Sequence, residues 1–135
     1  MKGILADNNI TTHLKCCLHV WEGPYWREVW HDLSLTVHTF EELGLAPKLA
    51  DSVLWQFCQA REIVLVTANR NADGPDSLEA TIRGHNGPTS LPVFTVADAD
   101  RVLLEGTYAT RVAEKLLVYL FIIDKVRGTG RLYVP

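Results

Sequence analysis

Lys2-Gly3-Ile4-Leu5-Ala6-Asp7-Asn8-Asn9 is a short apolar run that stops abruptly on one acid and two amides. An apolar run of this length is typical of a buried strand, whereas Asp and Asn are poor inside strands and common in turns and helix N-caps. The stretch therefore predicts a central strand that ends at Ala6, followed by a helix with Asn9 as its N-cap. Ligands of open α/β sheets bind outside the carboxyl ends of the strands. Asp7 is thus a candidate ligand-binding residue, and a purely capping role is the alternative.

The composition limits the class of protein. The chain has 135 residues, of which 47% are hydrophobic and 21% charged, as expected for one soluble domain with a substantial core. A net charge of -3 argues against a nucleic-acid binder held by bulk charge, but it permits a local basic patch. The three cysteines, Cys16, Cys17 and Cys58, lack metal-site spacing and predict reduced thiols in a cytoplasmic protein. We expect neither a signal segment nor a membrane span.

Four further stretches have the lengths and residue types of strands, and helical stretches separate them. The strand-like stretches are residues 35–40, 62–67, 91–96 and 131–134. Residues 48–61 show helical spacing, with Leu49, Val53 and Phe57 on the apolar side. The run Leu116–Ile123 is too short to cross a membrane and predicts a buried core helix. Alternating strands and helices predict a single α/β domain with a mostly parallel sheet.

An aromatic cluster lies between the first two predicted strands. Trp21, Tyr25, Trp26 and Trp30 fall within ten residues. Aromatic side chains of this kind can stack on nucleic-acid bases, but more often they pack against the protein or contact a partner. We predict packing or partner contact and keep base stacking as the alternative.

Acids and amides follow the predicted strands in a regular way. They are Asp7, Glu41 with Glu42, Asn69 with Asn71, and Asp98 with Asp100. In a parallel sheet these strand ends share one edge, where several carboxylates repel one another unless a cation or a proton intervenes. Oxygen ligands suit Mg²⁺ or Mn²⁺, and such ions can activate water for phosphodiester cleavage. The alternative is that Asp and Asn are present only because they favour turns.

Asp51, Asp76 and Asp98 each lie where a helix is predicted to begin. Asp51 is in the first turn of its helix, where it favours the helix dipole, and it could also face Asp7 across the sheet end. Asp76 and Glu79 have the spacing of a capping box, with Asp76 as the N-cap. Asp98 is a candidate N-cap for a helix over residues 99–104.

The layout resembles the PIN-like nuclease superfamily, in particular a small group whose N-terminal strand ends in Asp-Glu-Asn. The matching residues here are Asp7-Asn8-Asn9. The turn Glu42–Leu45 followed by Asp51 resembles the second acidic position of that group. The stretch Val64–Asn71 resembles its third motif, a strand followed by Thr-x-Asp-x-Asp. The likeness spans nearly the whole chain through short motifs.

The resemblance implies a three-layer α/β/α sandwich with a central, mostly parallel sheet, forming a single PIN-like domain over residues 1–135. It also implies a metal-dependent ribonuclease site using Mg²⁺ or Mn²⁺. Many relatives are toxins paired with antitoxins, and PIN domains often dimerise. The partners implied are therefore RNA, an antitoxin-like protein and a second copy of the chain.

The chain departs from the family pattern at two positions. Asn69 and Asn71 stand where the family carries Asp. An amide can bind a hard cation but brings no charge, so metal affinity should fall. Asp73, Asp76 or Asp98 could replace the missing carboxylate, and the alternative is a site that has lost catalysis.

Two hypotheses follow. In the first, the protein is a metal-dependent ribonuclease with Asp7 and Asp51 as main ligands. Asp76 or Asp98 completes that site, Asn69 belongs to it, and Arg70 contacts a phosphate. In the second, it is a catalytically impaired PIN-like module that binds a protein or nucleic acid. A third carboxylate beside Asp7 and Asp51 would favour the first hypothesis, and a salt link from Arg70 into the acidic pocket would favour the second.

Overall fold

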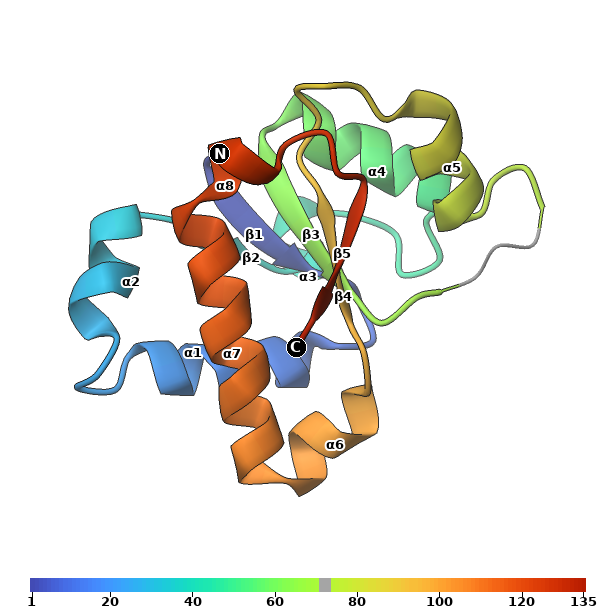
Figure 1. Cartoon of the computed structure of the whole chain (residues 1–135). Helices are drawn as coiled ribbons and strands as arrows, with labels where there is room; N and C mark the ends of the chain where they lie inside the picture. The colour runs from blue at the N-terminus through green and yellow to red at the C-terminus, as the bar shows by residue number, and fades with distance from the viewer. Residues whose placement is uncertain (71–73) are drawn as a thin grey trace.

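The computed structural model describes residues 1–70 and 74–135, so Asn71 and Asp73 lie outside the described residues. Within the described part of the chain, five strands form one sheet (Figure 1). The strands are β1 (Gly3–Ala6), β2 (Thr36–His38), β3 (Ile63–Thr67), β4 (Val93–Val96) and β5 (Arg131–Val134). They lie in the order β2-β1-β3-β4-β5, and every neighbouring pair is parallel. The predicted α/β fold with a parallel sheet is confirmed.

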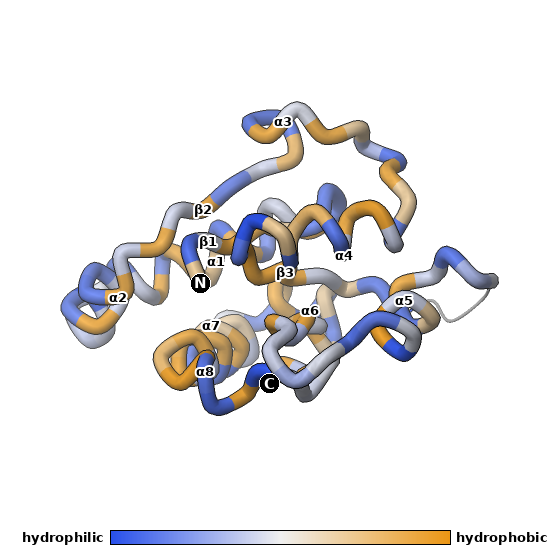
Figure 2. The backbone as a smooth tube through the Cα atoms, turned by 90° about the horizontal axis from the view of Figure 1, so that it is seen from above, coloured by the Kyte–Doolittle hydropathy of each residue, from blue (hydrophilic) through white to orange (hydrophobic). Residues whose placement is uncertain are grey.

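Helices cover both faces of this sheet. Those formed by the described residues are α1 (Thr11–Trp21), α2 (Arg27–Leu33), α3 (Phe40–Leu43), α4 (Asp51–Ala60), α5 (Leu78–His85), α6 (Ala99–Leu104), α7 (Gly106–Phe121) and α8 (Ile123–Val126). Side chains of α1, α2, α6, α7 and α8 share one buried cluster with the sheet, and those of α3, α4 and α5 share the other. Figure 2 shows α4 and α7 on opposite sides of β1 and β3. The fold is therefore the expected three-layer α/β/α sandwich.

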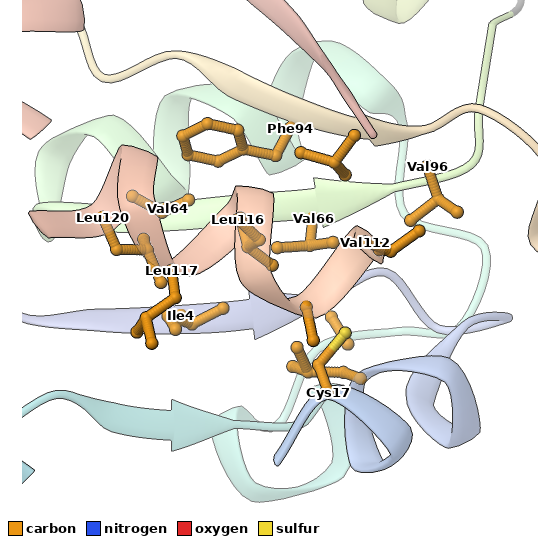
Figure 3. Packing of buried hydrophobic residues seen from close by; sticks show 14 of the residues in the cluster. Ile4, Cys17, Val64, Val66, Phe94, Val96, Val112, Leu116, Leu117 and Leu120 are labelled. Carbon is orange, nitrogen blue, oxygen red and sulfur yellow. The ribbon is translucent and has the colours of Figure 1, made fainter. Parts of the chain in front are cut away.

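The central strands are buried on both faces. In β3, Val64 and Leu65 are 0% and 3% exposed although their side chains point to opposite sides of the sheet. Val64 belongs to the cluster with α7, and Leu65 belongs to the cluster with α4. Figure 3 shows Val64 near Leu116 and Leu120 of α7. The unbroken apolar run of β3 is thus explained by burial on both faces.

The apolar run in α7 forms the predicted core helix. Leu116, Leu117 and Leu120 are at most 1% exposed and pack against β1 and β3. The helix ends at Phe121 and the short α8 begins at Ile123, so the predicted core helix over Leu116–Ile123 is interrupted at Ile122. None of the helices in residues 1–70 and 74–135 has the length and apolar character needed to cross a membrane.

The aromatic cluster divides into a buried half and an exposed half. Trp21 is fully buried, and its Nε1–H donates to the Ala113 carbonyl of α7 at 2.7 Å. The rings of Trp21 and Trp30 lie 4.7 Å apart, so these two residues fasten α1 and α2 to α7. Trp26 donates to Glu114 at 3.1 Å, and Tyr25 is 89% exposed. The predicted packing role is confirmed for Trp21 and Trp30.

Two element assignments from the sequence are wrong. The strand over residues 35–40 is shorter, because Thr39 leaves the sheet and caps α3 by accepting the Glu42 N–H at 3.2 Å. Glu42 therefore lies in a helix and not at a strand end. The helix over residues 48–61 begins at Asp51, and it buries Leu54 while Val53 is 51% exposed. Its sequence has apolar residues on both sides, so the pattern alone indicated the wrong face.

Leu120→Asp should lower the free energy of unfolding by about 3 kcal/mol or more, because it places an unpaired charge in the core. Leu104→Asp is the matched control, because Leu104 is 81% exposed and should change stability by less than about 0.5 kcal/mol. Urea unfolding followed by circular dichroism measures both. Equal effects of the two substitutions would show that α7 is not the core helix.

Candidate functional site

The strand order places a natural binding position at the carboxyl ends of β1 and β3. From β1 the chain passes to β2 on one side, and later strands add on the other side. Ligands of such sheets bind where the order reverses, here between β1 and β3. Asp7 directly follows β1, and Thr67 is the last residue of β3. The neighbouring pair Ala6 and Val66 is in register, so Asp7 and Thr67 meet at this point.

Asp7 is held by its own turn and by the neighbouring strand. Its N–H donates to the Val66 carbonyl at 2.8 Å, and its carbonyl accepts the Ile10 N–H at 3.0 Å. Its carboxylate accepts the Asn8 N–H at 2.8 Å and the Thr67 hydroxyl at 2.7 Å. Helix α1 begins at Thr11 without a side-chain cap, so the predicted N-cap at Asn9 is wrong. The main-chain bond to Ile10 closes the turn in its place.

Asn69 connects the two acids of the site. Its N–H donates to the Thr67 hydroxyl oxygen at 2.9 Å, and that hydroxyl in turn donates to Asp7. Its side-chain amide donates to Asp51 Oδ2 at 3.0 Å. The same oxygen of Asp51 accepts the Leu78 N–H at 3.2 Å. One continuous network thus runs from Asp7 through Thr67 and Asn69 to Asp51.

Asp7 and Asp51 line one cleft of about 370 Å³. Its lining consists of Asp7, Asn8, Asn9, Pro47, Leu49, Asp51, Ala68 and Asn69. A second hollow of about 360 Å³ lies next to it and shares Leu49 and Asp51. Asp51 therefore stands between the two openings. We call the first opening the Asp7 cleft.

Asp76 lies beside Asp51 but does not cap a helix. It lines the second hollow and accepts the Ser52 hydroxyl at 3.4 Å. The N-cap of α5 is Ser77, which accepts the Ala80 N–H at 3.1 Å. The predicted capping box is wrong, because Glu79 instead pairs with Arg131.

The remaining predicted site residues point elsewhere. Asp98 caps α6 as predicted, accepting the Arg101 N–H at 3.3 Å, and it does not line the Asp7 cleft. Arg70 donates to the Ala97 carbonyl, and its guanidinium lies over the Tyr133 ring, 5.4 Å from the centroid. Arg70 is thus directed toward the ends of β4 and β5 and, among the residues that the structure describes, forms no salt link into the cleft.

The donor set fits a partly hydrated divalent cation better than a closed acidic cage. Among the described residues, no three His, Cys, Asp or Glu side chains converge to form a metal-binding group. The Asp7 cleft offers two carboxylates and the amide of Asn69. Mg²⁺ usually keeps several waters and is bound through one or two carboxylates together with substrate phosphates. Asp7 and Asp51 fit that mode, and among the described residues neither Asp76 nor Asp98 joins them as the predicted third carboxylate.

The buried cysteines, Cys17 and Cys58, are unreactive thiols. Burial, with a smaller effect from the negative charge of Asp7, raises the pKa of Cys58 to about 12. Burial likewise raises the pKa of Cys17 to about 12. Both thiols are therefore protonated at neutral pH, and neither supplies a thiolate nucleophile. The chemistry of the cleft belongs to its oxygen ligands.

Sequence reasoning missed two members of the network, Thr67 and Arg131. The position of Thr67 as the last residue of a buried strand was the only available signal for its role. Arg131 donates to the Asn69 carbonyl from the far edge of the sheet, and no local pattern indicated this contact.

No known family model, curated protein or solved structure matches this chain. The resemblance to PIN-like nucleases therefore stays a prediction that depends on the short motifs described above.

Proposed function

We propose that this protein is a Mg²⁺- or Mn²⁺-dependent ribonuclease whose site is the Asp7 cleft. The observation that carries the proposal is that Asp7 and Asp51, from separate segments, line one cleft at the β1–β3 switch point. When bound there, the metal would supply an activated water and neutralise charge on a phosphodiester. Asp7 and Asp51 would hold it, and Thr67 and Asn69 would orient the two carboxylates.

The charge of the cleft makes metal and RNA binding interdependent. Two carboxylates repel a phosphodiester at close range, and a cation between them removes this repulsion. RNA should therefore bind the cleft weakly without metal. By linkage, RNA should raise the affinity for metal by the same factor. An effect of RNA on metal affinity distinguishes a metal site that the RNA phosphate helps to form from a metal site that the protein forms alone.

RNA would extend from the cleft toward Arg70 and Tyr133 on the same sheet edge. Tyr133 is 46% exposed, and Arg70 lies over its ring. An exposed ring beside a guanidinium suits base stacking and a phosphate contact. The free cysteines agree with a reducing compartment, and we propose the cytoplasm.

A second candidate function is a non-catalytic PIN-like module, and the orientation of Asn69 favours it. The side-chain amide of Asn69 already donates to Asp51 Oδ2, and it adds no negative charge to the site. A partner surface is available between α2 and α7. An apolar groove of about 210 Å³ is lined there by Trp26, Val29, Leu117, Val118 and Phe121. Its occupant would be a second copy of the chain or an antitoxin-like protein, and light scattering of the purified chain distinguishes these two.

Asp7→Asn and Asp51→Asn should each abolish Mn²⁺ stabilisation and RNA cleavage. In the wild type, Mn²⁺ at about a hundred times its dissociation constant should raise the free energy of unfolding by roughly 2.7 kcal/mol. Asp98→Asn is the matched control, because Asn caps a helix as well as Asp and Asp98 lies outside the cleft. Thermal melts with and without Mn²⁺, and cleavage of a labelled single-stranded RNA, provide the readouts. A wild type that neither responds to Mn²⁺ nor cleaves RNA would refute the nuclease proposal.

Asn69→Asp should turn the amide position into a third carboxylate. Without metal it should lower the melting temperature, because a donor to Asp51 is replaced by a like charge. With Mn²⁺ it should be stabilised more than the wild type. Asn86→Asp is the control, because Asn86 also donates its amide hydrogen, to Gly128 at 2.8 Å, but lies outside the cleft.

The Mn²⁺ response of the wild type decides between the two candidate functions. If Asn69→Asp responds to Mn²⁺ and the wild type does not, the impaired module is the correct function. If the wild type responds and Asn69→Asp responds no more strongly, position 69 does not face the metal.

A further inference from the structure

Arg131 is a buried cation on an edge strand. Its side chain is 8% exposed, although it begins β5 at the margin of the sheet. Its Nε–H donates to Glu79 Oε1 at 3.2 Å. Its Nη1–H donates to the Asn69 carbonyl at 2.8 Å and to the Thr95 hydroxyl oxygen at 2.5 Å. One guanidinium therefore joins β5, β4, α5 and the segment that follows β3.

Burial makes an arginine at this position costly for stability. A buried guanidinium is costly unless each nitrogen is satisfied. Here Nη2 is buried and has no hydrogen-bond partner among the described residues. An apolar side chain of similar volume would avoid that cost. The contacts that Arg131 makes therefore require a different explanation.

The contact with Asn69 offers one. Asn69 lies beyond the end of β3, so the sheet ladder does not hold its main chain. Its N–H bond to Thr67 spans only two residues, and its side-chain bond to Asp51 spans 18. The bond from Arg131 spans 62 residues and starts from a strand that is paired with β4. It anchors the Asn69 carbonyl to the body of the sheet.

We infer that Arg131 is a positioning residue for the Asp7 cleft, acting through Asn69. With its carbonyl anchored, Asn69 keeps its amide hydrogen on Asp51 and its N–H on Thr67, which in turn holds Asp7. The planar guanidinium holds Glu79 through Nε while its Nη1 reaches the Asn69 and Thr95 oxygens, whereas lysine would present a single ammonium. The inference rests on the proposed function for its effect on metal binding, but the anchoring itself does not.

Two variants separate positioning from a purely structural ion pair. Arg131→Lys keeps the charge next to Glu79 but loses the fork that reaches Asn69. Glu79→Gln removes the charge of the ion pair but keeps an oxygen that can accept the Nε–H of Arg131. A structural role predicts that both variants have the same effect on the cleft. Positioning predicts that only Arg131→Lys disturbs Asn69 and Asp51.

The readouts are the side-chain amide resonances of Asn69 in the metal-free protein and the Mn²⁺ affinity measured by calorimetry. In Arg131→Lys, the Asn69 amide signals should shift and lose protection from exchange, and Mn²⁺ affinity should fall by about tenfold or more, as for other residues that orient metal ligands. Glu79→Gln should leave both readouts at their wild-type values. Unchanged Asn69 signals in Arg131→Lys, or equal shifts in both variants, would overturn the inference.

The two proposals fail in different ways. If the wild type binds no Mn²⁺, the nuclease proposal fails, and the amide signals of Asn69 still decide whether Arg131 anchors it. If Arg131→Lys does not fold, Arg131→Gln tests the same contact, because it keeps a donor in the place of Nε beside Glu79 but lacks the Nη1 that reaches Asn69. In that variant the Asn69 amide signals should shift and lose protection from exchange, and unchanged signals would again overturn the inference.

Discussion

The parallel pairing of β1 with β3 is the constraint on which the cleft depends. Both strands are buried on both faces, with Ile4, Leu5 and Val64 among the least exposed residues of the protein. Buried backbone groups need partners, so the two strands must stay in register along their full length. The register ends with Ala6 opposite Val66. It leaves Asp7 beside the hydroxyl of Thr67 at the only point where the strand order reverses within the described sheet.

The polar network at that point, from Asp7 to Asp51, contains only these two charged groups, and Thr67 and Asn69 between them are neutral. The side-chain amide of Asn69 is a neutral donor to Asp51, and the main-chain N–H of Asn69 connects to Asp7 through the Thr67 hydroxyl. Such an arrangement holds Asp51 in place without metal, which a third carboxylate would not do. For the proposed metal site, the neutral amide would also lower the metal affinity, because charge provides most of the attraction for Mg²⁺. A weak metal site that RNA completes and a site that no longer binds metal would differ only in the strength of this attraction.

The sequence predicted the sheet and the place of Asp7 at the carboxyl end of β1 well, because those signals are local. The apolar runs of β1 and β3 and the N-cap at Asp98 depend on neighbours in the chain. Capping at Asn9 and Asp76 was wrong because Ile10 and Ser77 occupy the N-cap positions, one residue further along. A shift of one residue changes which side chain can reach the helix N–H groups.

Long-range contacts could not be predicted in this way. The hydrogen bond from Arg131 to Asn69 depends on β5 taking the edge position beside β4, which a single sequence does not specify. The short helix α2 is likewise held by burial of Trp30 against Trp21, since its sequence lacks a capping residue. These features are consequences of tertiary packing, which overrides local preference.

The most direct test of the account is paramagnetic broadening by Mn²⁺ in a two-dimensional NMR spectrum of the isotope-labelled protein. If Asp7 and Asp51 hold the metal together, the first amide signals to disappear at substoichiometric Mn²⁺ should be those of Asn8, Asn69 and Leu78, which donate to these acids or lie beside them. An uncleavable single-stranded RNA should lower the Mn²⁺ concentration needed. Broadening that begins at other acids, such as Asp98 or Asp124, or that ignores RNA, would contradict a shared metal site in the Asp7 cleft.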